Sequence, residues 1–334
     1  FLINYTAERL SAVKDDSGQV ITRFAVVGID QNLHGKRAPG SAPEVTFFNL
    51  QTPVAAVHNV VQAGIDEFSR LRMVKGLTFS ELPWSKDSGK TGTMTFSPAV
   101  KLDPKRIYFM GHSQGGLTGP VLLAHEPGIP AAVLSGAGGG AMLSLLGKTE
   151  PLDVRTILEL ALGEKVDIFH PLMNLVQQML EPADTSNYGR MLIRHPAKGV
   201  SPKHIFLSQG FTDNYTPNDT TDALAAAIGV PLAGKPIRPV AALKLRGLES
   251  TSVPLAGNLT VGGKAITGAL LQYQATRYNV KCNTKTDCTK GDYCDDKGYC
   301  SDDGHFVMFS HKTAIKQYSR FLATAARDGV PTIP

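Results

Sequence analysis

The chain has 334 residues, of which 42% are hydrophobic and 19% are charged, and its formal net charge at pH 7 is +5. This composition is typical of a globular protein with a sizeable core. The 34 lysines and arginines are scattered among 29 acidic residues, which argues against nucleic-acid binding, and no apolar stretch reaches the ~18 residues that a transmembrane helix needs.

The first part of the chain predicts alternating helices and strands. Residues 5–15 have the apolar spacing of an amphipathic helix. Residues 22–29 predict a strand whose core, 24–29, is an unbroken apolar run typical of a buried parallel strand. After a loop, a long helix is expected to begin at Pro53, with Thr52 as its N-cap.

Strands and helices continue to alternate along the rest of the chain. Residues 76–104 are polar and rich in glycine and proline, so a loop with short regular pieces is expected there. Apolar runs predict strands at 105–110, 131–136, 204–209 and 268–274, and a final helix closes the chain. This alternation predicts an α/β fold with a mainly parallel sheet flanked by helices.

Residues 141–200 interrupt the alternation with apolar residues at helical spacing. Between 172 and 180 they fall at i, i+3, i+4, i+7 and i+8. Two interpretations of this segment remain open. Its helices either extend the core or form a helical cap over a binding cleft.

All four cysteines lie in one polar segment, six residues apart: Cys282, Cys288, Cys294 and Cys300. Zinc sites usually bring ligands in close C-x2–4-C pairs, which this segment lacks, so two disulfides are favoured over zinc or free thiols. We favour the pairs 282–294 and 288–300, because interleaved bonds hold a short polar loop more tightly than nested ones. Disulfides persist in oxidising compartments, which predicts a secreted or periplasmic protein.

The sequence Gly111-His112-Ser113-Gln114-Gly115 has the form G-x-S-x-G. A predicted strand precedes it and a predicted helix follows it, which is the context of a nucleophilic serine on a sharp strand-to-helix turn. The glycines are expected to make room for this turn, and the backbone N–H of Gln114 is expected to face a developing oxyanion. The serine is therefore the candidate nucleophile rather than an ordinary loop residue.

A serine hydroxyl needs a base to take its proton, and the base needs a carboxylate to orient it. Among nine histidines, His305 has the expected place, after the last predicted strand and before the final helix. His112 is expected to point away from the serine. Asp213, just past the strand at 204–209, is the favoured acid, and Asp184 is the alternative.

The order Ser113, Asp213, His305 resembles that of the α/β-hydrolase superfamily, and in particular of its bacterial lipases and esterases. The stretch "GIDQNLHGKR" is also similar to a loop that follows the fourth strand of those enzymes. The resemblance implies a serine hydrolase of carboxylic esters with an apolar acyl or aromatic part, which needs no metal or organic cofactor. It also implies three parts of the chain. The hydrolase core comprises residues 1–140, 201–281 and 301–334, the helical cap comprises 141–200, and the disulfide-rich insertion comprises 282–300.

The chain departs from the family pattern in two places. The cysteine segment is an insertion about five residues before His305, where it could form a rim of the cleft or a solvent-exposed decoration. The strands and the oxyanion-hole loop that precede the first helix in the family are also missing. We therefore expect an upstream N-terminal polypeptide to complete the fold and to supply a second oxyanion donor.

Three functions remain open at this point. The first is a secreted esterase or lipase, which the resemblance favours. The second is a peptidase or amidase on the same fold, because a serine triad serves both reactions. The third is a non-catalytic binding protein whose cysteine segment contacts a partner.

Overall fold

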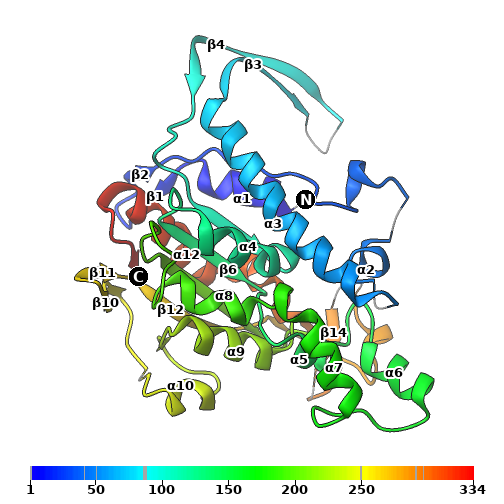
Figure 1. The fold of residues 1–334 in the computed structure, drawn as a ribbon. Coiled ribbons are helices and arrows are strands. Elements are labelled where there is room, and N and C mark those ends of the chain that lie inside the picture. Colours follow the sequence, from blue (N-terminus) through cyan, green and yellow to red (C-terminus); the bar gives the residue numbers. More distant parts are fainter. Residues whose placement is uncertain are drawn as a thin grey trace.

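A five-stranded parallel sheet lies at the centre of the computed structural model (Figure 1). The structure describes residues 2–40, 42–49, 51–85, 89–248, 250–289, 292–295 and 297–334. In spatial order the strands are β5 (Phe109–His112), β6 (Ala131–Ser135), β7 (His204–Phe211), β12 (Gly268–Gln274) and β8 (Leu232–Ala233). Each neighbouring pair is parallel, which confirms the predicted α/β fold with a parallel sheet.

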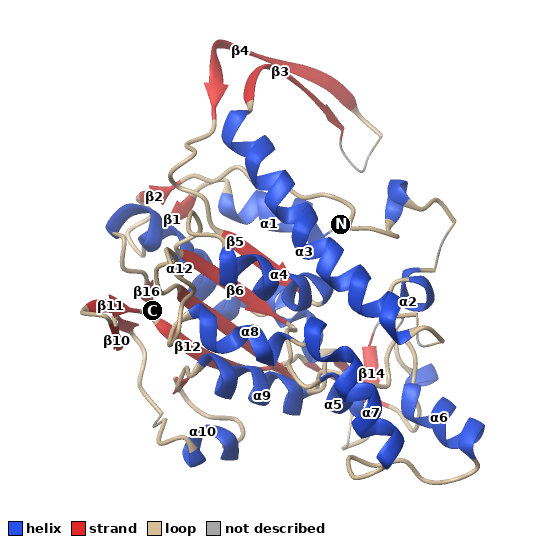
Figure 2. Cartoon of the chain, viewed as in Figure 1, coloured by secondary structure: helices blue, strands red, loops and turns tan. Residues whose placement is uncertain are grey.

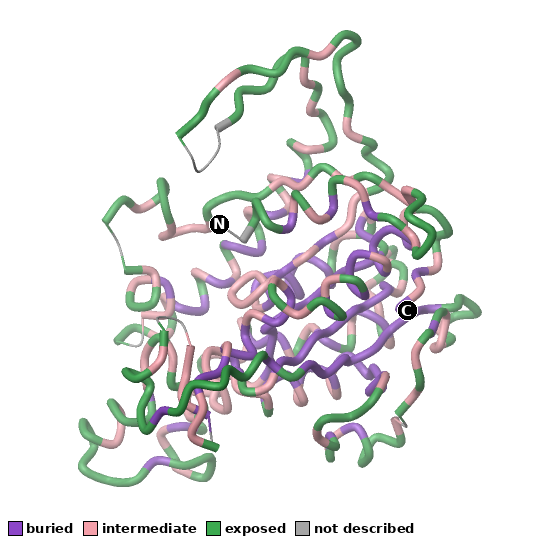
Figure 3. The backbone as a smooth tube through the Cα atoms, turned by 180° about the vertical axis from the view of Figure 1, so that it is seen from behind, coloured by how far each residue is buried: buried purple, intermediate pink, exposed green. Residues whose placement is uncertain are grey.

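Helices cover both faces of this sheet. Successive side chains of its strands point to opposite faces, and both faces are apolar, so each must be covered. In β6, Ala132 and Leu134 pack with one set of helices, whereas Ala131 and Val133 pack with the other. In front lie α3 (Pro53–Gly76), α4 (Gln114–His125), α8 (Thr185–Leu192) and α9 (Asn218–Ile228), and behind lies α12 (Lys312–Asp328) (Figure 2). The central strands are buried on both sides (Figure 3).

The expected strand at 22–29 is wrong. Residues 23–30 have no regular structure. Just before them, β1 (Val13–Lys14) pairs with β2 (Val20–Thr22) in a short antiparallel ribbon. A cavity of about 370 Å³ is lined by residues 22–27 and 106–110 among others, and the rings of Phe24 and Tyr108 touch beside it. Among the described residues, β5 pairs only with β6, so the run packs near the sheet edge without joining it.

The expected loop at 76–104 is also wrong. It forms a long antiparallel hairpin of β3 (Thr78–Ser85) and β4 (Thr91–Lys101), which projects beyond the end of α3 (Figure 2). Apolar and polar residues alternate along most of β4, and Trp84 of β3 covers Gly92 across the pair. The hairpin is mostly exposed, as the green tube in Figure 3 shows, so the polar composition that predicted a loop reflects exposure to solvent.

Residues 141–192 form four helices: α5 (Ala141–Gly147), α6 (Val154–Leu162), α7 (Pro171–Leu180) and α8. Helix α8 packs between α4 and α9 in the core. By contrast, α6 and α7 expose large apolar side chains, among which Leu160 and Leu175 are 79% and 58% exposed. The segment therefore contains one core helix and a set of peripheral helices.

The cysteine segment forms a separate three-stranded antiparallel sheet with the order β13 (Arg277–Lys281), β15 (Tyr299–Asp302), β14 (Asp292–Cys294). Disulfides join Cys282 to Cys294 and Cys288 to Cys300, which is the interleaved pairing favoured from the sequence. We call residues 277–302 the disulfide module.

The remaining elements are short. They are α1 (Leu2–Leu10), α2 (Pro43–Thr46), α10 (Ala241–Leu245), α11 (Val307–Ser310), β9 (Leu255–Ala256) paired with β16 (Thr332–Ile333), β10 (Leu259–Val261) paired with β11 (Lys264–Ile266), and the 3-10 turns 35–37, 181–183, 285–287 and 304–306. Among the described residues, no helix combines the length and the hydropathy that crossing a bilayer would require.

Candidate active site

Ser113 occupies a sharp turn between β5 and α4. Its backbone has φ 55° and ψ −120°, a left-handed φ that is rare for a residue other than glycine. Its N–H donates to the carbonyl oxygen of Ser135 at 2.9 Å, at the end of the neighbouring strand β6. The turn therefore holds Ser113 at the carboxyl edge of the sheet, in a conformation that is retained despite its strain.

Of the two glycines around Ser113, the structure requires only the first for steric reasons. A Cβ atom at Gly111 would lie 2.4 Å from the carbonyl oxygen of Gly115. A Cβ atom at Gly115 would meet no other atom within 4 Å. The expectation that both glycines make room for the turn thus holds at Gly111 and is wrong at Gly115.

Asp213 and His305 form a buried hydrogen-bonded pair. Asp213 lies in the loop after β7, and His305 lies in the 3-10 turn that follows the disulfide module. Both carboxylate oxygens of Asp213 are 3.0 Å from Nδ1 of His305, and the two residues are 5% and 2% exposed. The backbone N–H groups of Tyr215 and Thr216 donate to Oδ1 of Asp213 at 3.0 and 2.6 Å. The carboxylate is therefore held in one orientation toward the imidazole.

Rings and one glycine enclose the imidazole of His305. The ring of Tyr215 stacks on it with the centroids 4.8 Å apart. A Cβ atom at Gly136, which follows β6 with φ 50°, would lie 2.7 Å from Cε1 of His305, so only glycine leaves space there. Sequence reasoning missed both residues, although Tyr215 lies only two positions after Asp213.

Ser113 and His305 meet the same end of β6. The backbone of Ser113 bonds to Ser135, and the ring of His305 lies against Gly136. In the described part of the chain, however, the Ser113 hydroxyl forms no hydrogen bond to His305. The structure thus brings the expected nucleophile and base to one place without joining them, as is often seen for such pairs without substrate.

The ring of His112 packs against His305, a contact that the sequence did not predict. The centroids of these two rings are 4.6 Å apart. Phe309 lies edge-on to His112, with their ring centroids 4.8 Å apart. Burial, together with the neighbouring His305, holds the pKa of His112 well below its usual range.

Asp184, the alternative acid, has a different role. Its carboxylate accepts hydrogen bonds from the backbone N–H groups of Gly140 and Ala141 at the start of α5, and from that of Ser186 at the start of α8. Burial raises the pKa of Asp184, but these bonds and one from Gln177 outweigh burial and leave the pKa lowered. Asp184 is therefore a helix-capping residue, and it bonds to no histidine in the described chain.

Gln114 is the first residue of α4, where backbone N–H groups lack partners within the helix. Its side chain bonds to Gln31, whose own amide donates to Thr118 Oγ1 at 2.9 Å. The loop around Gln31 thus lies against the start of α4. The second oxyanion donor from an upstream polypeptide stays a prediction.

Within the described residues, one group of side chains comes close enough together to bind a metal ion: Cys282, Cys288 and Cys300. All three sulfur atoms are in disulfides, so they cannot serve as thiolate ligands.

No protein-family model and no curated protein matches the chain. Among solved structures, the chain is similar to acetyl xylan esterase 1 from Thermoanaerobacterium sp. JW/SL YS485, with a TM-score of 0.30 and 14% identity over 62% of this chain and 47% of that one. It is also similar to the acylaminoacyl peptidase of Pyrococcus horikoshii, with a TM-score of 0.30 and 14% identity over 61% of this chain and 23% of that one. The chain therefore spans less than half the length of either structure.

Proposed function

We propose that the chain is a serine hydrolase of the α/β-hydrolase superfamily that cleaves carboxylic esters. The observation that carries this proposal is the buried Asp213–His305 pair, which meets the end of β6 beside the strained turn of Ser113. A nucleophile, a base and an orienting acid in this order along the chain have the roles of a serine triad.

In the proposed reaction, Oγ of Ser113 attacks the ester carbonyl carbon while Nε2 of His305 takes the hydroxyl proton. The backbone N–H of Gln114 donates to the oxyanion of the tetrahedral intermediate. The intermediate expels the alcohol, which leaves with the proton from His305, and an acyl-Ser113 ester remains. Water then attacks this ester with His305 as base, which releases the acid and restores Ser113.

We propose that the acyl part of the substrate is apolar or aromatic and that α5–α7 form a cap near the triad. The backbone N–H groups of Thr149 and Glu150, which follow α5, donate to the carbonyl oxygen of Asn214 beside Asp213, so this segment adjoins the acid loop. This segment exposes several large apolar side chains, Leu160 and Phe169 among them, as surfaces that bind an apolar ligand do. The two disulfides support secretion or a periplasmic location, because such bonds persist in oxidising compartments.

A fluorophosphonate probe tests the proposal, because it labels only an activated serine. We expect the full chain to be labelled at Ser113 and to hydrolyse p-nitrophenyl esters, and Ser113→Ala to lose both properties with an unchanged circular dichroism spectrum. No labelling of the folded wild-type chain would favour a non-catalytic binding protein, and labelling of another serine would exclude Ser113 as nucleophile. Turnover of anilide or peptide substrates faster than esters would favour the peptidase alternative.

A further inference from the structure

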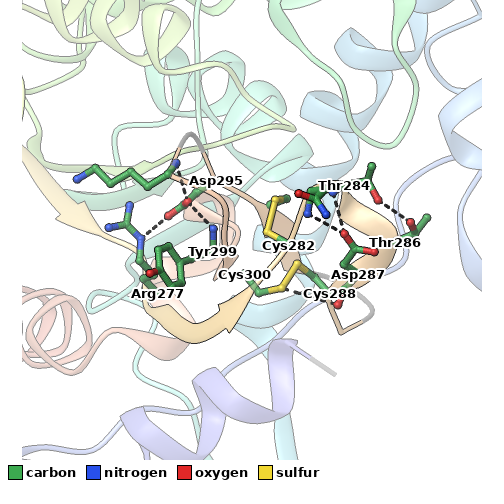
Figure 4. Close-up of a disulfide and its surroundings, with 12 residues drawn as sticks. Arg277, Cys282, Thr284, Thr286, Asp287, Cys288, Asp295, Tyr299 and Cys300 are labelled. Atoms are coloured by element: carbon green, nitrogen blue, oxygen red, sulfur yellow. Dashed lines mark hydrogen bonds and ion pairs between the residues drawn. A yellow bond between two sulfur atoms is a disulfide. The ribbon is translucent and has the colours of Figure 1, made fainter.

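The disulfide module has little apolar core of its own, and polar contacts hold it together. Its two disulfides lie at the centre of Figure 4, where Asp295 accepts hydrogen bonds from Arg277 and from the backbone N–H of Tyr299. On the other side of the disulfides, Asp287 accepts from the backbone N–H of Thr284 (Figure 4). Two interleaved disulfides and the ion pair between Arg277 and the buried Asp295 restrain this small unit beside the neighbouring loop.

The module contacts the loop that carries Asp213. The hydroxyl oxygen of Tyr293, in β14, accepts a hydrogen bond from the backbone N–H of Thr212 at 3.1 Å. The carbonyl oxygen of Thr212 accepts from the N–H of Gly304 at 2.7 Å, just beyond the module. Both backbone polar groups of the residue before Asp213 are therefore held from this side.

The residue after Asp213 is held from the same side. Asp303 follows the last strand of the module, is 4% exposed, and accepts from the backbone N–H of Asn214 at 3.3 Å and from its side-chain amide at 2.8 Å. The same carboxylate accepts from the backbone N–H of His305 at 2.8 Å. One side chain thus links the loop of the acid to the loop of the base.

Asp303 occupies an unfavourable place for a carboxylate. Burial raises the pKa of Asp303, and the nearby charge of Asp213 raises it further, although the hydrogen bonds from His305 and Asn214 act in the opposite direction. A buried carboxylate beside another is costly unless its hydrogen bonds compensate for it. The bonds to Asn214 and His305 are the compensation that the structure shows.

The loop of His305 also touches the end of β7, directly before the acid loop, through its backbone. A Cβ atom at Gly304 would lie 2.5 Å from the carbonyl carbon of Gly210, so the loop of His305 can approach β7 this closely only with glycine there. Such a contact leaves little freedom for either loop to shift independently.

We infer that the disulfide module, together with Asp303 directly after it, is a structural support of the triad. Tyr293 of the module and Asp303 are positioning residues that hold Asp213 against His305. This inference rests on the proposed function, in which Asp213 orients the base. The sequence leaves open whether the cysteine segment forms a rim of the cleft or a solvent-exposed decoration. The inference gives this segment a role in catalysis. The module acts through the acid loop and touches no reacting atom.

Tyr293→Phe tests this inference, with Tyr278→Phe as its matched control. Each variant removes one tyrosine hydroxyl from the module, but Tyr293 bonds to the acid loop, whereas Tyr278 bonds to Asp302 within the module. We expect Tyr293→Phe to lower kcat for a p-nitrophenyl ester about 3- to 10-fold with little change in KM, as for loss of one hydrogen bond. Tyr278→Phe should keep the wild-type kcat, and equal losses in the two variants would overturn the inference.

Asp303→Asn should have a larger effect, about 30-fold in kcat, because it removes charge-assisted hydrogen bonds at both loops. The double variant Asp303→Asn/Asn214→Asp again places an amide opposite a carboxylate, and we expect it to recover part of this loss. No recovery in a folded double variant would argue against the Asp303–Asn214 link.

A second readout does not depend on turnover. The proton between Nδ1 of His305 and Asp213 is expected to give a low-field NMR resonance in the Ser113→Ala background. We expect Tyr293→Phe and Asp303→Asn to broaden this resonance and Tyr278→Phe to leave it sharp. If the wild-type chain is not labelled by fluorophosphonate, the proposed function fails, whereas an unchanged resonance in both test variants would refute the positioning role itself.

Discussion

The carboxylate of Asp213 faces Nδ1 of His305 with both oxygens at 3.0 Å, although 92 residues separate the two along the chain. The pair is buried, and backbone N–H groups hold the carboxylate from the other side. In this arrangement Nδ1 carries the proton, so Nε2 is the nitrogen that can accept one from a nucleophile.

Asp213→Asn should therefore lower kcat for a p-nitrophenyl ester about 10⁴-fold, because an amide no longer selects the productive tautomer of His305. Asp184→Asn should keep kcat per folded molecule and lower the free energy of unfolding by about 1 kcal/mol, because an amide nitrogen cannot accept the bonds that Ala141 and Gln177 donate to the second carboxylate oxygen. Kinetics and chemical denaturation of both variants measure the difference. The opposite ranking would move the acid to Asp184.

Gly111→Ala should destabilise the turn of Ser113, whereas Gly115→Ala should be tolerated. The new methyl group at position 111 would overlap the carbonyl group of Gly115, while the one at position 115 has open space. We expect Gly111→Ala to reduce both the midpoint of thermal unfolding and fluorophosphonate labelling. Equal stability of the two variants would show that the turn has a different conformation.

His204 should make the protein sensitive to acid. Burial lowers its pKa to about 4, and its Nδ1 accepts a hydrogen bond from the backbone N–H of Thr267 at 2.9 Å. Because the unfolded state takes up a proton near pH 6.5 and the folded state does not, stability falls as the pH drops from about 6.5 to 4, by about 3 kcal/mol for this group.

His204→Asn should remove this pH-dependent loss of stability. The side-chain carbonyl oxygen of asparagine can accept the hydrogen bond from Thr267, and the amide does not titrate in this range. Chemical denaturation of both proteins between pH 4 and pH 7 gives the two slopes. The remaining slope of the variant includes His112, whose pKa is also lowered by burial. Identical slopes in the two proteins would contradict the assignment to His204.

Tryptic mapping without reductant should recover the pairs Cys282–Cys294 and Cys288–Cys300. Lysines at 281, 285, 290 and 297 place each cysteine on its own peptide, so the three possible pairings give different masses. After reduction we expect faster amide exchange in residues 277–302 while β6 and β7 stay protected, because each bond closes a short loop worth about 3 kcal/mol. A peptide joining Cys282 to Cys288 would exclude the interleaved arrangement.

The sequence by itself determined the features that depend on local pattern. The start of the helix at 53–76 follows from Pro53 at its first position, although the Thr52 side chain forms no capping hydrogen bond there. The strand at 131–135 follows from its apolar run, and the strand–turn–helix context of Ser113 from the order of residues around it. Neighbouring residues set these backbone conformations, so no distant contact was needed to predict them.

Only the tertiary structure decided which distant segments come together. An apolar run predicts burial but not a hydrogen-bonded partner, so residues 24–29 matched a strand and yet form no regular structure beside β5. The contact of His112 with His305, the space left by Gly136 and the bond from Thr212 to Tyr293 join segments with no shared local pattern. Such contacts depend on how the whole chain closes its backbone hydrogen bonds around the sheet, and no short stretch of sequence encodes that.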